Sequence, residues 1–438
     1  MKQTKKLDNW WQRHALSRSA NVVVALSGGR DSTLLLTLLQ QLHLQNRIGV
    51  VYAAWFDHRL RPEHEILQEE KMVRFNCSSM EIPLSIGRAD PQQMQSLIAM
   101  HGMEAAARIM RYTFLQGVCR QYDASLLAVA HHQDDQVETV IMRLAGGSTI
   151  EGLAGISPQR DLADGLELIR PLSDWTSDEI ATASASISYH EDSTNYDTSI
   201  RRNAVRSKAI PVLRDIFPAL GTSVQRAAAD IRETVAWLQD FLPAFLHEIP
   251  LPGRCGVQIS NEAFCSLPGS IRCLYLMRLQ NRLCPDSFGR IPRSVFHPLA
   301  ELETRDISTT SRIFAGVGLE IYQQREIIAI VTIRAVSRRW SLRVEAIPSP
   351  GERISLPNGA SLDPADVHGP GFRMPLFLRS PVAGDTLSKG KTLKSWFQRN
   401  GVPSYLRNVH TVIENQGGYI SAILDPAGRL LWKDSALQ

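Results

Sequence analysis

The sequence has few cysteines, and none of them belongs to a recognisable motif. The 438-residue chain contains six, and no two of them form a C-x-x-C pair. In a chain this long, scattered cysteines favour reduced thiols and argue against a disulfide framework or a cysteine-based zinc site. They are Cys77, Cys119, Cys255, Cys265, Cys273 and Cys284.

Long apolar runs and extremes of charge are also absent. No apolar run approaches the roughly 20 residues of a membrane span, and the basic start "MKQTKKLDNWWQRHALSRSA" lacks the apolar core of a secretion signal. We therefore expect a cytoplasmic protein with no membrane partner. The net charge of +4 permits an anionic partner without requiring one.

Strand-like and helix-like segments alternate in the first half of the chain. Residues 21–26 and 47–56 are apolar runs typical of strands buried on both faces, and residues 32–43 between them read as a packed helix. A further strand at 124–130 precedes a helix at 134–145. This alternation predicts an α/β fold with a doubly wound, Rossmann-like parallel sheet and a site at the carboxyl ends of its strands.

The second half has a different pattern. Helical periodicity occurs at 223–249, 264–284 and 294–303, a β-hairpin is expected at 311–331, and 345–372 reads as a linker or a short β segment. We expect three domains. They are a catalytic domain at 1–215, a mainly helical substrate-binding domain at 216–340, and a C-terminal α+β domain at 341–438.

The turn "SGGRDS" at 27–32 follows the first strand. Gly28 and Gly29 let the backbone bend, and the N-terminus of the next helix offers free N–H groups to an anion. Ser27 and Ser32 add hydroxyls. Asp31 would repel a bare phosphate but suits one bound to Mg²⁺. The segment is not a Walker A loop. The alternative is an ordinary turn with a serine cap.

The stretch "HHQDDQVET" at 131–139 carries acids and histidines. His131, Asp135 and Glu138 would share one helical face if the helix begins that early. Next to a nucleotide, the carboxylates could hold Mg²⁺ or orient a substrate amine, and the two histidines could contact phosphate or the transferring group. The alternative is an acid-rich helix start. A zinc site is not expected, since no cysteine lies nearby and H-E-x-x-H is absent.

Several arginines and one histidine are further candidates. Arg108 and Arg111 could neutralise charge that builds on phosphate, the alternative being a solvated helix face that forms salt bridges. His58 at a strand end suits a nucleotide contact or a structural role. Arg202 and Arg206 belong to the basic cluster "RRNAVR", for which we expect contact with ATP or RNA, the alternative being a solvated helix start.

A basic segment without acids lies near the C-terminus. Trp396, Phe397 and Tyr405 interleave with its cations, and aromatic rings can stack on unpaired bases. We expect these aromatics to be mostly core and the cations to meet RNA. The cations are Lys389, Lys391, Lys394, Arg399 and Arg407.

Six stretches carry a resemblance to known families. "SGGRDS" resembles the phosphate-binding loop of the N-type ATP pyrophosphatases (the PP-loop superfamily), which adenylate a substrate and release pyrophosphate. The stretches at 56–62, 104–112, 130–156 and 191–213 resemble the tRNA(Ile)-lysidine synthetase family within it, and 377–425 resembles that family's C-terminal domain. The usual family pattern has Gly where Arg59 stands and Pro-Ser-Asn near 193–195.

The resemblance implies a ligase that uses ATP and Mg²⁺. It would join free L-lysine to the wobble cytidine of tRNA(Ile) with anticodon CAU, through an adenylated cytidine, and so change codon reading from AUG to AUA. It implies an ATP site at Ser27, Gly28, Gly29, Arg30, Asp31, Ser32 and His58. It implies catalytic roles for Asp31, Arg108, Arg111, His131, Asp135 and Glu138, with Asp31 and Asp135 on the metal.

Two rival functions differ in their chemistry. A tRNA thiolase would use the same adenylation but would need an active cysteine, and Cys77 and Cys119 lack the usual spacing. A tRNA-binding protein with an inactive nucleotide fold would not need the intact loop or the acidic stretch. Whether the chain forms a homodimer stays open.

Overall fold

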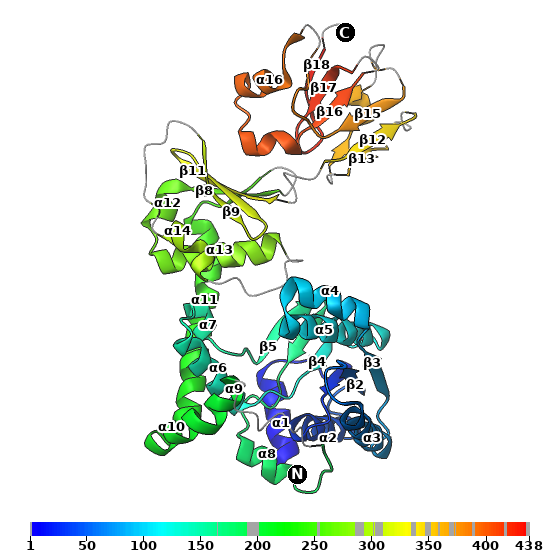
Figure 1. Ribbon diagram of the computed structural model, residues 1–438, viewed down its shortest axis with the longest axis vertical. Coiled ribbons are helices and arrows are strands. Elements are labelled where there is room, and N and C mark those ends of the chain that lie inside the picture. Colours follow the sequence, from blue (N-terminus) through cyan, green and yellow to red (C-terminus); the bar gives the residue numbers. More distant parts are fainter. Residues whose placement is uncertain are drawn as a thin grey trace. The chain divides into compact units, whose positions relative to one another are not determined.

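The computed structural model describes fourteen segments of the chain. They are residues 2–163, 165–190, 201–251, 255–284, 293–300, 302, 310–333, 339–346, 352–357, 360–367, 372, 374–387, 390–415 and 418–434. The chain divides into two compact units, Met1–Val235 and Ala236–Gln438, whose elements are labelled in Figure 1.

A six-stranded sheet organises the first unit. In chain order its strands are β1 (Val22–Leu26), β2 (Val51–Asp57), β3 (Leu84–Arg88), β4 (Leu126–Ala128), β5 (Gln159–Ala163) and β6 (Leu166–Ile169). Their order in space is β3-β2-β1-β4-β6-β5, with β5 antiparallel to β6 and the other pairs parallel. The order reverses between β1 and β4, which is where open α/β sheets bind ligands. The doubly wound sheet expected from the sequence is confirmed.

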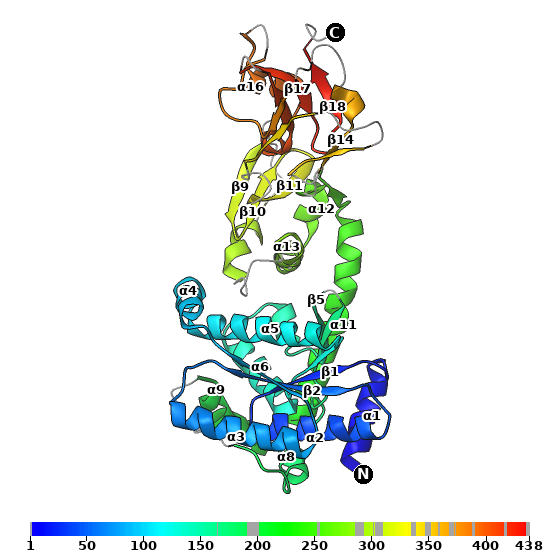
Figure 2. The same cartoon turned by 90° about the vertical axis from the view of Figure 1, so that its right-hand side faces the viewer.

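Helices cover both faces of this sheet. They are α1 (Lys2–Arg13), α2 (Arg30–Leu44), α3 (Glu63–Ser79), α4 (Pro91–His101), α5 (Met103–Gln121), α6 (Gln133–Ala145), α7 (Ile150–Leu153), α8 (Ser177–Ala183), α9 (Arg201–Ala204), the π-helical η2 (Val205–Ala209), α10 (Ile210–Ile216) and α11 (Leu220–Phe245). Figure 2 shows the sheet nearly edge-on, with α2 and α3 on one face and α5 on the other.

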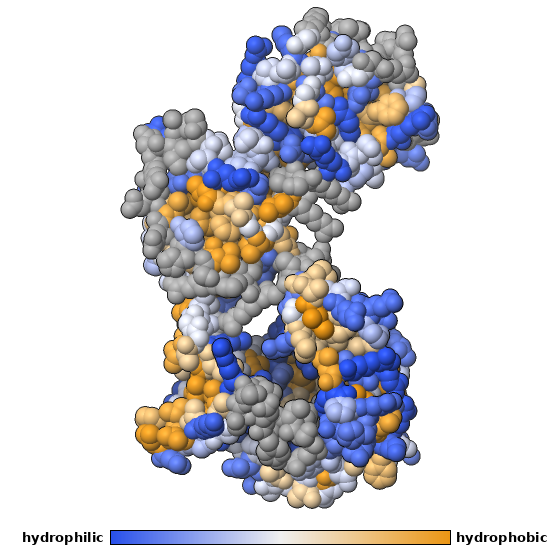
Figure 3. Space-filling model, in the orientation of Figure 1, coloured by the Kyte–Doolittle hydropathy of each residue, from blue (hydrophilic) through white to orange (hydrophobic). Residues whose placement is uncertain are grey.

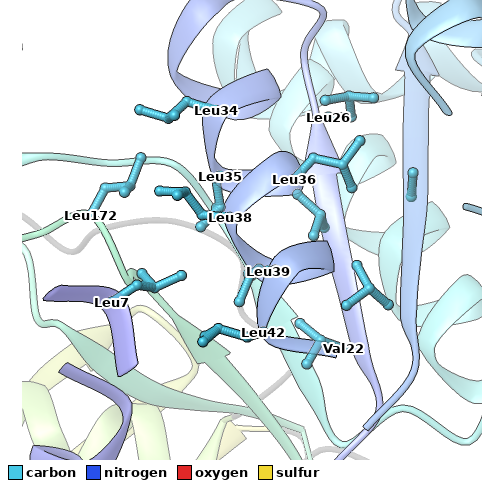
Figure 4. Close-up of a cluster of buried hydrophobic side chains, with 14 of the residues drawn as sticks. Leu7, Val22, Leu26, Leu34, Leu35, Leu36, Leu38, Leu39, Leu42 and Leu172 are labelled. Atoms are coloured by element: carbon cyan, nitrogen blue, oxygen red, sulfur yellow. The ribbon is translucent and has the colours of Figure 1, made fainter. Parts of the chain in front are cut away.

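The core follows from strand alternation. Side chains of neighbouring strand residues point to opposite faces, so Val22 and Val24 join one cluster and Val23 the other. The first cluster contains the leucines of α2, which Figure 4 shows packed against Val22 and Leu26. The second contains Leu115 of α5. Because both faces are covered, β1 needs the uninterrupted apolar run that the sequence shows.

The second unit begins with a five-stranded sheet and helices. Its strands are β7 (Ile249–Pro250), β8 (Gly256–Ser260), β9 (Ser311–Gly316), β10 (Leu319–Gln323) and β11 (Ile327–Thr332). The helices are α12 (Asn261–Ser266), α13 (Gly269–Leu283), the 3₁₀ turn η4 (Arg293–Phe296) and α14 (His297–Ala300). Residues 311–331, expected to form one hairpin, hold three antiparallel strands, β9, β10 and β11. The region read as mainly helical therefore also contains an antiparallel sheet, and its strand β8 has only five residues, too few to show a clear period.

A second five-stranded sheet follows in the same unit. It consists of β12 (Ser341–Val344), β15 (Leu376–Arg379), β16 (Thr411–Glu414), β17 (Ile420–Leu424) and β18 (Leu430–Lys433), paired in that order. A ribbon of β13 (Ile354–Ser355) and β14 (Ser361–Leu362), the 3₁₀ turns η5 (Pro364–Val367) and η7 (Ser404–Val409), and helix α16 (Leu393–Arg399) complete it. The α+β character expected of the C-terminal region is therefore confirmed.

Neither unit contains a membrane-spanning element among the residues described. No helix there combines the length and the apolar character that a bilayer crossing requires. The three-domain division at residues 215 and 340 stays a prediction.

Candidate active site

The turn after β1 is folded by its own hydroxyl groups. Ser32 Oγ accepts a hydrogen bond from the Ser27 backbone N–H at 3.1 Å and donates one to the Gly29 carbonyl at 3.0 Å. Gly28 has φ +76°, a conformation that favours glycine. Gly29 is the N-cap of α2 and has no side chain to cap the helix, so the first N–H groups face outward. The turn can therefore receive an anion.

Arg30 and Asp31 form the first turn of α2. Arg30 donates from Nε to Asp31 Oδ1 at 2.9 Å and from Nη2 to Ser177 Oγ of α8 at 3.0 Å. Burial alone would raise the pKa of the Asp31 carboxyl, but His132 and Arg30 outweigh it and hold the pKa below its usual value. Asp31 is thus an anion at neutral pH, with 31% of its side chain still exposed.

His132 joins the turn after β1 to helix α6. It is the N-cap of α6. The ring Nδ1 accepts a hydrogen bond from the Asp134 backbone N–H, and the backbone N–H of His132 donates one to Asp135 Oδ2 at 2.9 Å. Its Nε2 lies 3.5 Å from Asp31 Oδ2 and 3.6 Å from Asp135 Oδ2. Burial would lower the pKa of His132, but the two carboxylates raise it. One imidazole therefore holds together two acids that are far apart in sequence.

His131 has a different environment. Because α6 starts at Gln133, His131 precedes the helix, and the expected single face of His131, Asp135 and Glu138 is wrong for the histidine. His131 Nδ1 accepts a hydrogen bond from Arg170 Nε at 3.1 Å. Burial, with nearby arginines, lowers the pKa of His131 to about 4, so the ring is neutral.

Three arginines of the α9–η2–α10 segment pair with the acids of α6. Arg202 donates to Glu138 Oε2 at 2.7 Å and to Asp135 Oδ1 at 2.5 Å. Arg206 donates to both oxygens of Glu138. Arg214 pairs with Asp134. Arg202 and Arg206, which the sequence assigned to ATP or RNA, therefore lie at acids that the sequence analysis expects to be catalytic.

The outer side of α10 is apolar. Val212, Ile216 and Phe217 are each more than half exposed, and Figure 3 shows orange atoms over this helix. The polar side of α10 thus faces α6 through Arg214, while its apolar side faces solvent. Ile210 is the buried apolar residue of α10, and the pairing of Arg214 with Asp134 adds a polar contact to α6.

Positive charge also comes from α5. The guanidinium carbon of Arg108 lies 4.8 Å from the ring centre of Tyr112, and that of Arg111 lies 5.6 Å from it. Burial lowers the pKa of His58 to about 4, and the charge of Arg111 contributes to this. Arg111 likewise lowers the pKa of His131. The charge of Arg111 therefore reaches residues after both β2 and β4.

A magnesium ion would find carboxylates but not a complete set of protein ligands. In the segments that the structure covers, no three His, Cys, Asp or Glu side chains form a metal-binding group. Mg²⁺ commonly takes only one or two carboxylates and completes its shell with phosphate oxygens and water. Asp31 and Asp135, which face the same His132 nitrogen, fit that requirement when ATP is present.

The C-terminal cations divide into two kinds. Lys391, Lys394 and Arg399 are exposed on or beside α16, whereas Arg407 is half-buried and donates from Nε to the Val402 carbonyl at 3.2 Å. Lys389 lies outside the described residues. Phe397 and Tyr405 are buried, and Trp396 packs against the same core as Phe397, which confirms the expectation that these aromatics are core.

Two cysteines that a sulfur-transfer reaction could use are inaccessible. Cys77 and Cys119 are both buried. Burial raises the pKa of the Cys77 thiol to about 11 and that of Cys119 to about 12. The reactive thiolate is therefore scarce at neutral pH, which weighs against a thiolase.

Comparison with known proteins identifies relatives. Residues 1–213 match the PP-loop domain family. The chain is 34% identical over 238 residues to the tRNA(Ile)-lysidine synthase of Bacillus cereus, covering 54% of this chain and 49% of that one. It is 30% identical over 321 residues to the tRNA(Ile)-lysidine synthase of Lactiplantibacillus plantarum, covering 73% of this chain and 68% of that one. The chain belongs to the tRNA(Ile)-lysidine synthase family.

Family membership confirms the resemblance seen in the sequence. The matching region nevertheless spans only about half the length of the Bacillus cereus relative. A solved structure of the U34-tRNA thiolase NcsA from Methanococcus maripaludis aligns with a TM-score of 0.45 and 19% identity, covering 52% of this chain and 78% of that chain.

The structure adds two residues to the candidate site of this family member. His132 was grouped with His131 in the sequence, and only the fold shows that it faces Asp31. Arg170, directly after β6, is buried and donates to His131 and to the Ser157 carbonyl. The sequence could have indicated Arg170, because it is an arginine at the end of a buried strand, where ligands bind in such sheets.

Proposed function

We propose that this chain ligates L-lysine to the wobble cytidine of tRNA(Ile) with anticodon CAU, using ATP and releasing AMP and pyrophosphate. Family membership supports the proposal. The observation that carries it is the meeting of Asp31, His132 and Asp135 beside an open helix N-terminus. That arrangement suits a triphosphate whose α-phosphate is attacked by a nucleophile.

The first step is adenylation of the tRNA. The 2-oxygen of the cytosine attacks the α-phosphate of ATP, and the bond to the β-phosphate breaks, so pyrophosphate departs. Backbone N–H groups of residues 28–32 would bind the departing group, and Arg108 and Arg111 would balance its charge. His58 and His131 are neutral at pH 7 and would contact the nucleotide as hydrogen-bonding groups.

The second step is transfer of lysine. The ε-amine attacks carbon 2 of the activated base, a proton leaves the nitrogen, and the carbon–oxygen bond breaks to release AMP. The amine must be neutral to attack, so a carboxylate next to it would accept its proton or orient it. Asp135 and Glu138 are the two candidates, and both are held in place by Arg202 and Arg206.

Magnesium would shield the negative charge of the phosphates, with Asp31 and Asp135 as its protein ligands. Lys391, Lys394 and Arg399, together with Lys389, would attract the tRNA backbone. A cytoplasmic location follows from the tRNA substrate. Whether the chain forms a homodimer stays open, and analytical ultracentrifugation of the full chain measures it.

Pyrophosphate release tests the proposal. The purified chain is mixed with ATP, Mg²⁺ and tRNA(Ile) transcripts that carry either the CAU anticodon or a substituted wobble base. Release with CAU alone, followed by incorporation of labelled lysine into that tRNA, supports the proposal. Methionine tRNAs with the same anticodon serve as a specificity control.

Other outcomes overturn it. Transfer of sulfur to the tRNA would indicate a thiolase. Tight binding of tRNA with no pyrophosphate release would indicate a binding protein that has lost its activity.

A further inference from the structure

A buried glutamate lies directly behind the phosphate-binding turn. Glu69 of α3 is 4% exposed. Its Oε1 accepts a hydrogen bond from Trp55 Nε1 at 2.6 Å, and its Oε2 pairs with Arg61. A Cβ atom added to Gly28 would lie 2.6 Å from Glu69 Cγ, so the glutamate stem packs against the glycine backbone. No sequence motif pointed to this residue.

Three parts of the candidate site meet at this side chain. Gly28 belongs to the turn after β1, Trp55 to β2, and Arg61 to the segment after β2 that also carries His58. The Gly28 carbonyl also accepts a hydrogen bond from the His190 N–H at 3.0 Å, so Gly28 is held from a second side. Figure 2 shows α3 on the same face of the sheet as α2, the helix that the turn begins.

A buried carboxylate is costly unless its charge is balanced. The ion pair with Arg61 balances the charge of Glu69. The hydrogen bond from Trp55 fixes the orientation of the carboxylate. Gly28 leaves no gap behind it, because the glutamate stem fills the space that a Cβ would occupy. The position of one side chain thus sets both the depth of the turn and the course of the segment at 57–61.

We propose that Glu69 is a positioning residue for ATP: it holds the phosphate-binding turn at Gly28 and the segment of His58 and Arg61 in one fixed arrangement. Glu69 itself contacts no substrate. The proposal rests on the proposed function only in that ATP is the ligand of the turn. Small displacements of groups that orient a reacting phosphate are expected to slow the reaction strongly.

The neighbouring residue provides a matched control. Glu70 is on the same helix, is 7% exposed, and pairs with two arginines, Arg74 and Arg88. Its partners belong to α3 and β3, and neither is part of the phosphate-binding turn or of the segment at 57–61. A purely structural role for Glu69 would make the two glutamates equivalent.

The test compares Glu69→Gln with Glu70→Gln in the full chain. The amide keeps the size of the side chain and an acceptor for Trp55 but removes the charge opposite Arg61. For E69Q we expect the Kd and KM for ATP to rise about tenfold, with tRNA affinity and the KM for lysine within twofold of wild type. For E70Q we expect all these values within twofold, at a similar loss of thermal stability.

Calorimetric titration of ATP separates this proposal from the proposed function. If the wild type binds ATP but makes no lysidine, the function is wrong, and the ATP affinities of the variants still test Glu69. Equal ATP affinity in E69Q, E70Q and wild type overturns the positioning role. Should E69Q fail to fold, Arg61→Gln removes the same ion pair from the exposed side and should weaken ATP to a similar extent. Unchanged ATP affinity in R61Q would then overturn it.

Discussion

At the scale of single residues, the site depends on acids whose charge is fixed by their neighbours. Asp31 stays ionised because His132 and Arg30 outweigh its burial. Asp135 stays ionised because His132 and Arg202 do the same. Two carboxylates that face one imidazole would repel each other without it. This arrangement keeps both acids ready for a cation carried by the substrate.

Asp31→Ala should abolish adenylation while leaving tRNA affinity nearly unchanged. The carboxylate is the group in the turn that can face a metal-bound phosphate, so its loss should slow pyrophosphate release at least about a hundredfold. Asp31→Asn keeps the shape and should be nearly as slow. The measurements are pyrophosphate release and tRNA binding by filter retention, and release at the wild-type rate from either variant would contradict the role.

His58 should make the protein sensitive to acid. Its pKa is about 4 in the folded chain and near 6.5 when unfolded. The unfolded state therefore binds more protons between these values, so the stabilisation present above pH 6.5 is lost as the pH falls toward 4. His58→Gln cannot titrate and should lose less stability between pH 7 and pH 5 than wild type. Urea denaturation at each pH measures this, and parallel losses would contradict it.

Arg59 occupies a strained backbone position. Its φ is +55°, in the left-handed region, which explains why the usual family pattern has glycine there. Arg59→Gly should relieve about 1 kcal/mol of strain and raise the midpoint of thermal unfolding by about 2–4 °C. Leu60→Gly, at the next residue, should instead lower the midpoint, because it raises the conformational entropy of the unfolded chain and relieves no strain. A lower midpoint of thermal unfolding for Arg59→Gly would contradict the claim that the backbone of Arg59 is strained.

At the scale of elements, the segment from α9 to α10 is held on α6 by charge. Arg202, Arg206 and Arg214 each contact an acid of the first two turns of α6. Ile210 is buried, whereas Val212 and Ile216 on the outer face of α10 are exposed, so these ion pairs are the polar contacts that orient the segment.

Arg202→Lys should reduce turnover about tenfold or more, because one ammonium cannot bridge Glu138 and Asp135 as the planar guanidinium does. Among the ion pairs given above, Arg214 pairs with Asp134 alone. Arg214→Lys should therefore retain most activity. Steady-state kinetics of the two variants checks this. Equal effects would mean that the arginines serve only to attach the segment.

The sequence predicted elements better than it predicted their contacts. The apolar run at 21–26 and the leucines at 34–42 predicted β1 and α2, since burial on all sides leaves a local signature. Strand β8 was missed because five residues carry little periodicity. The contact of Arg202 with Glu138 joins residues 64 positions apart, and no local pattern encodes it. The sequence also could not show that His132 is the N-cap of α6, because the exact start of the helix at Gln133 was not predictable.

At the scale of the whole molecule, the proposed function assigns the nucleotide to the first unit and the attraction of tRNA to cations of the second. The first unit carries the nucleotide-binding turn, and the second carries exposed cations at Lys391, Lys394 and Arg399. Phosphate contacts of this kind supply affinity that depends on salt but not on sequence. Under the proposed function, these cations would attract the tRNA backbone without reading its sequence.

Lys389, Lys391 and Lys394 changed together to Ala should weaken tRNA binding and flatten its salt dependence. Each lost phosphate contact should reduce the slope of log K against log salt by about 1. Changing the exposed Lys2, Lys5 and Lys71 of the first unit should leave the slope unchanged. Binding measured between 50 and about 200 mM salt decides the matter, and an unaltered slope in the first variant would rule out the patch.

The most direct measurement is a crystal structure of the chain with Mg²⁺ and a non-hydrolysable ATP analogue. The account predicts that the β- and γ-phosphates lie within hydrogen-bonding distance of the backbone N–H groups of residues 28–32, with the metal next to Asp31. A triphosphate bound anywhere else, with Ser27 to Ser32 free of it, would contradict the account.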